Sequence, residues 1–390
     1  MSVNKKIYVG MSGGVDSSLA AALLVEQGYD VTGVYMKNWS QDLPGMKCPW
    51  AEDLADAKRV AVQLGIDFKV FDFEAEYKQK VVDYMIDEYK NGHTPNPDIM
   101  CNQEVKFKLF LDAAIGDGAD MIATGHYARV CNLETDKPST IFSQRLHAGH
   151  DKGPDALSSS GCRCYSKTVD GLSAGVLLRA VDDNKDQTYF LYRVTGAAMG
   201  KTLFPIGGFT KPNVRKMAEA RGLTTAVKKD SQGICFVGQV GIRDFLSLYV
   251  DLKPGKIIDK KSGTVLGHHD SAIFYTLGQR HGLELGGGLP YYVVGKDMDK
   301  NEVYVTTDLN DGTLWHDTVE LHSVHWINDA PANGKYLIRS RHRAPLVSAD
   351  ITVDGDKVSL KLTDPQRAFA PGQSVVIYDD QICLGGGIII

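Results

Sequence analysis

The stretch that decides the fold is KIYVGMSGGVDSS, residues 6–18 of this 390-residue chain. Residues 6–11 have the apolar and aromatic character of a buried strand, and a helical pattern begins at Ser18. A glycine-rich turn between a strand and a helix directs backbone N–H groups at an anion. Ser17 and Ser18 could cap the helix, and Asp16 could orient phosphate-bound Mg²⁺. The stretch therefore predicts a nucleotide site, with an ordinary capped turn as the alternative.

The same alternation of strand and helix continues through the first third of the chain. Further strands are expected at residues 31–36, 68–73 and 121–124, and helices at 18–27, 50–64, 74–91 and 104–115. Such βαβ repetition predicts a parallel sheet covered by helices. From about residue 252 short alternating strands and glycine-rich turns replace this pattern, so the C-terminal third is expected to be all-β.

The length of the chain predicts two or three domains. With 43% hydrophobic and 23% charged residues, the composition is that of a soluble globular protein. Because 43 Lys and Arg residues face 48 Asp and Glu residues, a nucleic-acid partner would need a local basic surface. The apolar run at residues 7–9 is too short for a signal peptide or a membrane span, which predicts a cytoplasmic protein without a membrane partner. The seven cysteines are expected to be reduced thiols with individual roles.

One cysteine with a suggestive setting is Cys101. Two prolines, Pro95 and Pro97, pre-set the backbone before it as extended. If a helical turn begins here, Asp98 and Cys101 share one face. Because a nearby carboxylate raises the pKa of a thiol, Asp98 is better suited to carry protons or to orient a base than to stabilise a thiolate. Read locally, a buried core cysteine is the alternative.

The second such cysteine is Cys235. Two lysines at residues 228–229 could favour its thiolate if they fold back toward it, and Gly233 leaves room for a substrate or loop. The local alternative is a strand cysteine between two apolar neighbours.

Six motifs occur in an order that carries a family resemblance. They are residues 12–17; 96–98 followed by 101–102; 124–128; 182 with 185–187; 231 with 233–236; and 276–280. The first resembles the PP-loop of ATP pyrophosphatases, and it lacks the lysine of a Walker A loop. The ordered set resembles the bacterial tRNA-specific 2-thiouridylases of the MnmA family over nearly the whole chain, including residues 383–387.

The resemblance, together with the strand pattern, implies an α/β fold in three parts. The first is a parallel-sheet PP-loop domain of the adenine nucleotide alpha hydrolase-like type. A small β-rich central domain follows, and then a C-terminal β-barrel that contacts tRNA. The expected bounds are 1–246, with an insertion at about 131–178, then 247–308 and 309–390.

The resemblance also implies a reaction. ATP with Mg²⁺ adenylates C2 of uridine 34, the wobble base of the tRNA anticodon, and sulfur then replaces the oxygen, giving 2-thiouridine, AMP and PPi. The sulfur arrives as a persulfide on Cys235, passed from an upstream sulfur carrier or cysteine desulfurase. Either the persulfide sulfur or hydrosulfide released from it attacks C2. Attack of Cys101 on the persulfide would release sulfide and leave a Cys101–Cys235 disulfide. Asp98 manages protons at the base.

The binding residues follow from the same resemblance. The nucleotide pocket is implied at Gly10, Met11, Ser12, Gly13, Gly14, Val15, Asp16, Ser17, Met36 and Gly125. The tRNA contacts are implied at Asn96, Pro97, Asp98, His126, Lys185, Asp186, Gln187, Arg341, His342 and Gln373. No fixed metal site is expected beyond Mg²⁺ with ATP near Asp16, and the protein is expected to be a monomer. The basic run at 339–343 also fits a solvated edge strand protected by charge.

The insertion departs from the family pattern. Its Cys162 and Cys164 could suggest a metal, but no second ligand pair at the usual spacing follows, so a surface loop with incidental thiols is favoured. Cys48 and Cys131 are interpreted in the same way. Two other functions stay open: a PP-loop enzyme acting on a small molecule, and a non-catalytic ATP-binding sulfur carrier or RNA-binding module.

Overall fold

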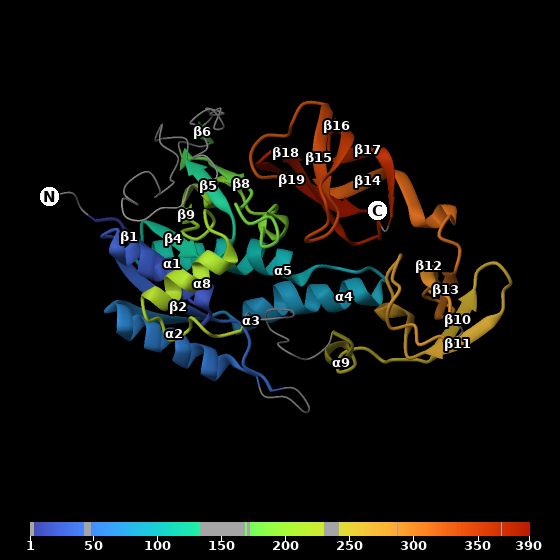
Figure 1. Ribbon diagram of the computed structural model, residues 1–390, viewed down its shortest axis with the longest axis horizontal. Helices are drawn as coiled ribbons and strands as arrows, with labels where there is room; N and C mark the ends of the chain where they lie inside the picture. Colours follow the sequence, from blue (N-terminus) through green and yellow to red (C-terminus); the bar gives the residue numbers. More distant parts are fainter. Residues whose placement is uncertain are drawn as a thin grey trace.

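A five-stranded parallel sheet forms the N-terminal part of the protein (Figure 1). The computed structural model describes residues 4–42, 48–132, 168–169, 172–229, 242–286, 288–367 and 369–390. The sheet order is β3-β2-β1-β4-β9. The strands are β1 (Lys6–Gly10), β2 (Asp30–Lys37), β3 (Asp67–Asp72), β4 (Met121–Thr124) and β9 (Thr202–Leu203). The chain runs from β1 to β3 in one direction and resumes at β4 on the other side of β1. The switch between β1 and β4 is where such sheets bind ligands.

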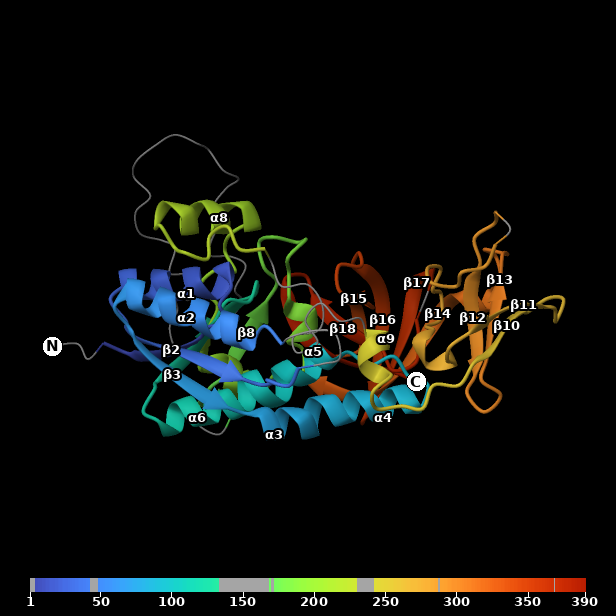
Figure 2. The ribbon, with the colours of Figure 1, turned by 90° about the horizontal axis from the view of Figure 1, so that it is seen from below.

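Helices cover both faces of this sheet, as Figure 2 shows. One face carries α1 (Val15–Glu26), α2 (Trp50–Leu64) and α8 (Lys211–Ala220). The other face carries two long helices, each with a π-type middle segment. They comprise α3 (Glu74–Tyr77), η1 (Lys78–Asp83) and α4 (Tyr84–Lys90), and then α5 (Pro97–Met100), η2 (Cys101–Leu109) and α6 (Phe110–Gly116). In the described ranges, no helix is both long enough and apolar enough to cross a membrane.

Short elements connect the sheet to the rest of the chain. They are β5 (Arg129–Asn132), β6 (Thr168–Val169), β7 (Leu172–Ser173), β8 (Gly175–Leu178), η3 (Thr188–Phe190), α7 (Gly196–Gly200) and α9 (Ile242–Leu246). Most of the predicted insertion lies outside the described residues, including Cys162 and Cys164.

Two β structures follow. The first is a four-stranded sheet in the order β11-β10-β13-β12. It consists of β10 (Gly255–Asp259), β11 (Val265–His269), β12 (Tyr292–Asp297) and β13 (Glu302–Thr306), with η4 (Ala272–Phe274) beside it. The second follows η5 (Gly312–Leu314) and comprises β14 (Trp315–Trp326), β15 (Gly334–Arg339), β16 (Val347–Asp354), β17 (Lys357–Arg367), β18 (Ser374–Asp379) and β19 (Ile382–Ile389). Pairing of β14 with β19 closes these strands into a barrel. The predicted fold class is confirmed.

A buried ion pair joins the barrel to the N-terminal domain. Asp186 Oδ2 accepts a hydrogen bond of 2.8 Å from Arg339 Nη1, and the two residues are only 1% and 4% exposed. Asp186 also accepts from the backbone N–H of Ala180 at 3.1 Å and from Thr188 Oγ1 at 2.9 Å. Because a buried charge is costly without partners, these bonds hold the connection in one arrangement.

A lysine of the central sheet, Lys296, is half-buried. Lys296, on β12, donates from Nζ to the backbone oxygen of Tyr275 at 3.0 Å. Burial lowers the pKa of Lys296 from 10.5 to about 8. The folded protein therefore binds this proton less tightly than the unfolded chain does.

Removing one partner of the buried pair should be strongly destabilising. We expect Asp186→Ala to lower the free energy of unfolding by about 3–5 kcal/mol, because Arg339 would remain buried and unpaired. The control is Asp183→Ala: the Asp183 side chain is 75% exposed and pairs with Arg179, so its loss should cost less than about 1 kcal/mol. Urea unfolding measures both, and equal losses in the two variants would contradict the assignment.

The lowered pKa of Lys296 predicts how the stability of the protein depends on pH. The charge of this lysine costs stability below about pH 8, and this cost disappears as the pH rises toward 10.5. We expect Lys296→Met to be more stable than the unchanged protein at neutral pH, and the two to converge toward pH 10.5. Urea midpoints measured across this range test it, and a difference that does not vary with pH would be inconsistent with a lysine titrating near pH 8.

Candidate active site

The turn between β1 and α1 can be built only with glycine at its centre. Gly13 has a φ of +73°, and a Cβ there would lie 2.3 Å from the backbone oxygen of Asp53 on α2. Gly14 follows with extended backbone and is the N-cap of α1. Because the first N–H groups of a helix have no intrahelical acceptor, they are left to bind an anion at this turn.

The hydroxyls of the first helical turn brace the loop, but they do not cap the helix as predicted. Ser17 Oγ and Ser18 Oγ donate to the backbone oxygen of Gly14 at 3.2 and 2.8 Å. The backbone N–H of Ser12 donates to Ser17 Oγ at 3.2 Å. The expectation of serine caps is wrong because the helix begins earlier than Ser18, at Val15, which places both serines inside its first turn.

Two other predicted pocket residues lie directly against this turn. A Cβ on Gly125, which follows β4, would lie 2.6 Å from the backbone nitrogen of Ser17. A Cβ on Gly10 would lie 2.9 Å from Met36 Cε. The structure thus brings together the residues 10–17, Met36 and Gly125 at the switch between β1 and β4.

Asp16 is held by a lysine that the sequence analysis missed. Lys211 Nζ lies 2.8 Å from both carboxylate oxygens of Asp16, and Tyr127 Oη donates to Oδ1 at 2.9 Å. Lys211 is the first residue of α8 and is 8% exposed. It gives the phosphate turn a cation that the turn's own sequence lacks. No local motif marks Lys211, since it is 195 residues away from Asp16 along the chain.

The segment with Asp98 and Cys101 begins a long helix on the opposite face of the sheet. Asn96 Oδ1 caps this helix by accepting from the backbone N–H groups of Asp98 at 3.1 Å and Ile99 at 3.4 Å. Pro97 occupies the first helical position and is buried. Cys101 is the first residue of the π-type segment η2 and is 0% exposed. Such π-type segments are frequent at functional sites.

The same helix reaches the phosphate turn further along. Phe110 Cε1 would lie 3.5 Å from a Cβ on Gly10. The Phe107 ring lies 5.6 Å from the ring of His126, which follows Gly125. Burial lowers the pKa of His126 well below 6.5, so this imidazole is neutral near pH 7. The helix therefore connects the thiol segment with the nucleotide turn.

Among the predicted tRNA contacts, Asp186 is a correction. It is buried in the ion pair with Arg339, so a tRNA could not reach it. Its neighbour Gln187 accepts from the backbone N–H of Tyr127 at 2.9 Å, and Lys185 is half-buried in the same loop. The family resemblance implied a tRNA contact at all three residues. The sequence does not show that Asp186 is buried, because its partner Arg339 lies far along the chain.

Three further predicted contacts gather at one edge of the barrel. Arg341 is exposed, and its Nε donates to Gln373 Oε1 at 3.4 Å. The ring of His342 lies 4.6 Å from the ring of Phe190, and burial lowers the pKa of His342 to about 4. The imidazole is therefore neutral near pH 7 and would contribute stacking or hydrogen bonds instead of charge. The backbone oxygen of Phe190 accepts from Asn102 Nδ2 at 3.0 Å, which links this edge to the residue after Cys101.

Cys235 lies outside the described residues, within the span 230–241. Lys228, just before this span, pairs with Asp53 and Asp56 of α2 at 2.7 and 2.5 Å. Two carboxylates thus bind the Lys228 ammonium group, and support of a Cys235 thiolate by residues 228–229 stays a prediction. Asp53 is also the residue against which Gly13 packs, so the chain enters the span beside the phosphate turn.

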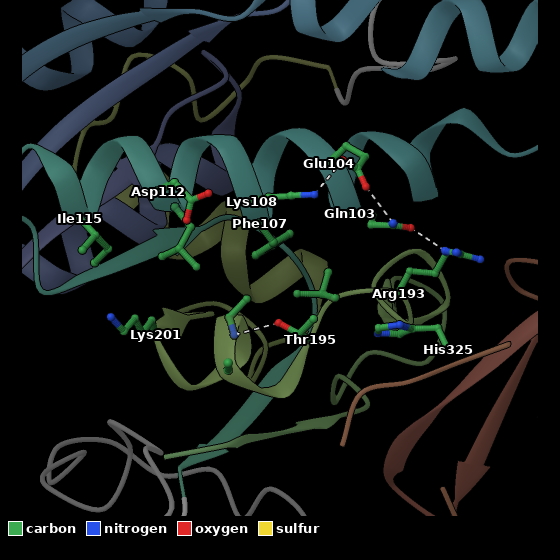
Figure 3. Close-up of a pocket in the computed structure, with 14 residues that line it drawn as sticks. Gln103, Glu104, Phe107, Lys108, Asp112, Ile115, Arg193, Thr195, Lys201 and His325 are labelled. Atoms are coloured by element: carbon green, nitrogen blue, oxygen red, sulfur yellow. Dashed lines mark hydrogen bonds and ion pairs between the residues drawn. The ribbon is translucent and has the colours of Figure 1, made fainter. Parts of the chain in front are cut away.

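A cavity of about 530 Å³ lies elsewhere, between the η2–α6 helix and α7 (Figure 3). Arg193 and His325 line one end, where Arg193 Nε donates to Gln103 Oε1 at 2.5 Å, and Glu104 pairs with Lys108 at 3.3 Å. None of the predicted site residues lines it. In the described part of the chain, no group of three or more His, Cys, Asp or Glu residues could hold a metal ion.

Comparisons with known proteins agree with this architecture. Family models match at residues 5–239 (tRNA methyl transferase HUP domain), 243–307 (tRNA methyl transferase PRC-barrel domain) and 316–389 (aminomethyltransferase beta-barrel domain). The chain is 42% identical over 388 residues to the tRNA-specific 2-thiouridylase MnmA of Bacillus cytotoxicus, covering 98% of this chain and 94% of that protein. It is 41% identical over 392 residues to the protein of the same name from Enterococcus faecalis, covering 98% and 95%. This chain belongs to the family of MnmA tRNA-specific 2-thiouridylases.

Proposed function

We propose that this protein replaces the C2 oxygen of uridine 34 in tRNA with sulfur, using ATP and a cysteine persulfide. The observation that carries the proposal is that the helix that begins with Asp98 and Cys101 continues to Phe110, which lies beside Gly10 at the start of the proposed phosphate turn. The family membership supports the substrate and the reaction, because the relatives are named tRNA-specific 2-thiouridylases.

ATP would bind at the turn between β1 and α1. The N–H groups at the start of α1 and the nearby Lys211 ammonium supply positive charge for phosphate oxygens. Asp16 would share the Lys211 ammonium with phosphate oxygens of the bound triphosphate, and its carboxylate could orient the Mg²⁺ that accompanies them. The uracil C2 carbonyl is a poor electrophile, and transfer of AMP to its oxygen, with release of PPi, creates a leaving group. Displacement of AMP then lets a sulfur nucleophile take the place of the oxygen.

The sulfur steps would use Cys235 and Cys101. An upstream sulfur carrier or cysteine desulfurase transfers sulfur to Cys235 as a persulfide. The Cys101 thiolate attacks the Cys235 sulfur, which forms a Cys101–Cys235 disulfide and expels hydrosulfide, and the hydrosulfide displaces AMP from C2. Direct attack by the terminal persulfide sulfur is the other route. An external thiol reduces the disulfide before the next cycle.

The tRNA would approach along the barrel edge with Arg341, His342 and Gln373, near Lys185 and Gln187. A wobble base is already unpaired, so moving it out of the anticodon loop costs little. Asn96 and Asp98 are proposed to contact the extruded base, with Asp98 carrying its proton. We propose that a single copy of the chain suffices.

The phosphate turn can be tested at Asp16. We expect Asp16→Ala to slow PPi release in the presence of tRNA by about a hundredfold, because Lys211 loses its partner and the charge arrangement around the phosphates changes. Glu26→Ala is the matched control: Glu26 is in the last turn of the same helix and pairs with Arg221 at 2.6 Å. PPi release from Asp16→Ala at the unchanged rate would reject this nucleotide site.

The two cysteines should have separable effects. We expect Cys235→Ala to abolish thiolation from a persulfide donor while ATP binding persists, and Cys101→Ser to abolish hydrosulfide release. Cys48→Ala, which changes a cysteine without an assigned role, should keep full activity. Mass spectrometry of tRNA nucleosides, with AMP measured in the same reaction, tests this.

The same reaction separates the other candidate functions. AMP release without a thiolated nucleoside would favour a small-molecule PP-loop enzyme. ATP binding without AMP release would favour a non-catalytic carrier.

A further inference from the structure

The segment between α4 and α5 lies where all three parts of the protein meet. Thr94 Oγ1 shares a hydrogen bond of 3.0 Å with Thr276 Oγ1 of the central domain. On the barrel side, the backbone N–H of Thr94 donates to the oxygen of Pro371 at 3.4 Å. A Cβ on Gly372, whose φ is +83°, would lie 2.6 Å from His93 Cβ. Both β structures therefore contact residues 93–94 directly.

A second contact with the central domain fixes the start of this segment. Gly92 ends the preceding helix with a φ of +79°, and a Cβ there would lie 2.7 Å from Met298 Cγ. Met298 follows β12 directly, is partly buried and packs against the core of the central sheet. Residues 92–94 are thus in close contact with both the central domain and the barrel.

The hydroxyl of Thr276 is presented by a rigid turn. The backbone N–H of Thr276 donates to Gln279 Oε1 at 3.0 Å, and the backbone N–H of Gln279 donates to the oxygen of Thr276 at 3.0 Å. Gly278, with a φ of +78°, donates from its backbone N–H to the oxygen of Val293 at 2.8 Å. This turn is the motif at residues 276–280, to which the nucleotide and sulfur chemistry assigns no task.

The segment leads directly into the sulfur-transfer residues. Asn96, two positions after Thr94, caps α5 by accepting from Asp98 and Ile99. Pro95 and Pro97 on either side of Asn96 are buried, and each fixes its own φ and restricts the residue before it. With so few free torsions, a displacement at Thr94 passes into α5 instead of being absorbed by the loop.

We propose that Thr94 and Thr276 are positioning residues for Asp98 and Cys101, so that the central domain sets the geometry of the segment that handles sulfur. The role in catalysis rests on the proposed thiolation activity. The geometric role does not, because it concerns how firmly α5 and its thiol are held.

The test compares Thr94→Val and Thr276→Val with Thr94→Ser and Thr276→Ser. Valine keeps the shape and removes the hydroxyl, whereas serine keeps the hydroxyl. We expect each valine variant to lower kcat for tRNA thiolation about fivefold, the change that loss of one net hydrogen bond gives. The KM for tRNA should stay within about twofold, since neither residue is a predicted tRNA contact. The serine variants should keep kcat.

A second readout does not depend on the reaction. The rate at which iodoacetamide alkylates Cys101, measured by mass spectrometry of the whole protein, should rise about fivefold in the valine variants because α5 is held less firmly. Thr264→Val, at an exposed turn of the central domain, is the control and should leave both rates unchanged.

The outcomes separate the two proposals. Valine variants with unchanged kcat and unchanged alkylation, or serine variants as impaired as the valine variants, would overturn the positioning role. If the unchanged protein fails to thiolate tRNA, the proposed function fails, and the alkylation rates alone decide the positioning role. The double variant Thr94→Val/Thr276→Val should be no worse than either single variant, because both remove the same bond.

Discussion

The close approach of the end of β4 to the first turn of α1 is the constraint on which the rest of the structure depends. There is no space for a side chain at Gly125, because a Cβ would lie 2.6 Å from the nitrogen of Ser17. On the other side of the turn, Gly13 packs against the backbone of α2 with a φ that favours glycine. The parallel sheet must therefore place β1 and β4 side by side, and α2 must lie close enough to complete the turn.

Charge around this turn is supplied by segments that come late in the chain. Lys211, at the start of α8, binds Asp16, and Lys228, which follows α8, binds Asp53 and Asp56. Both lysines anchor the chain beside the phosphate turn before it enters residues 230–241. The last described residues before this span therefore lie beside the nucleotide turn.

The sequence predicted those features that depend on residues close together along the chain. The helix expected at residues 50–64 and the strand expected at 121–124 have the observed bounds, because their periodicity is set by neighbours in the sequence. The residues of the phosphate turn could also be predicted from the sequence, since glycines between a strand and a helix have a specific backbone role. The role of Lys211 and the burial of Asp186 could not be predicted, because each depends on a partner more than 150 residues away. An exposed aspartate and a buried one cannot be told apart in the sequence, because only the fold shows whether an arginine lies close enough to pair with it.

The nucleotide turn and the thiol segment differ in how they are held, and this difference has a mechanistic consequence. Every contact described above around the phosphate turn comes from the N-terminal domain, from β1, β2, β4, α1, α2, α6, α8 and Tyr127. The segment before Asp98 and Cys101 instead contacts the central domain at Thr276 and the barrel at Gly372. Phe190 adds a further link, since its backbone oxygen accepts from Asn102 and its ring packs at a tilt against that of His342 of the barrel. ATP binding can thus be complete within one domain, whereas the geometry for sulfur transfer depends on the β domains. Because the predicted tRNA contacts include the barrel edge, a bound tRNA would act on the thiol segment through the contacts that hold that segment. Sulfur release would then be coupled to the presence of the base that accepts the sulfur.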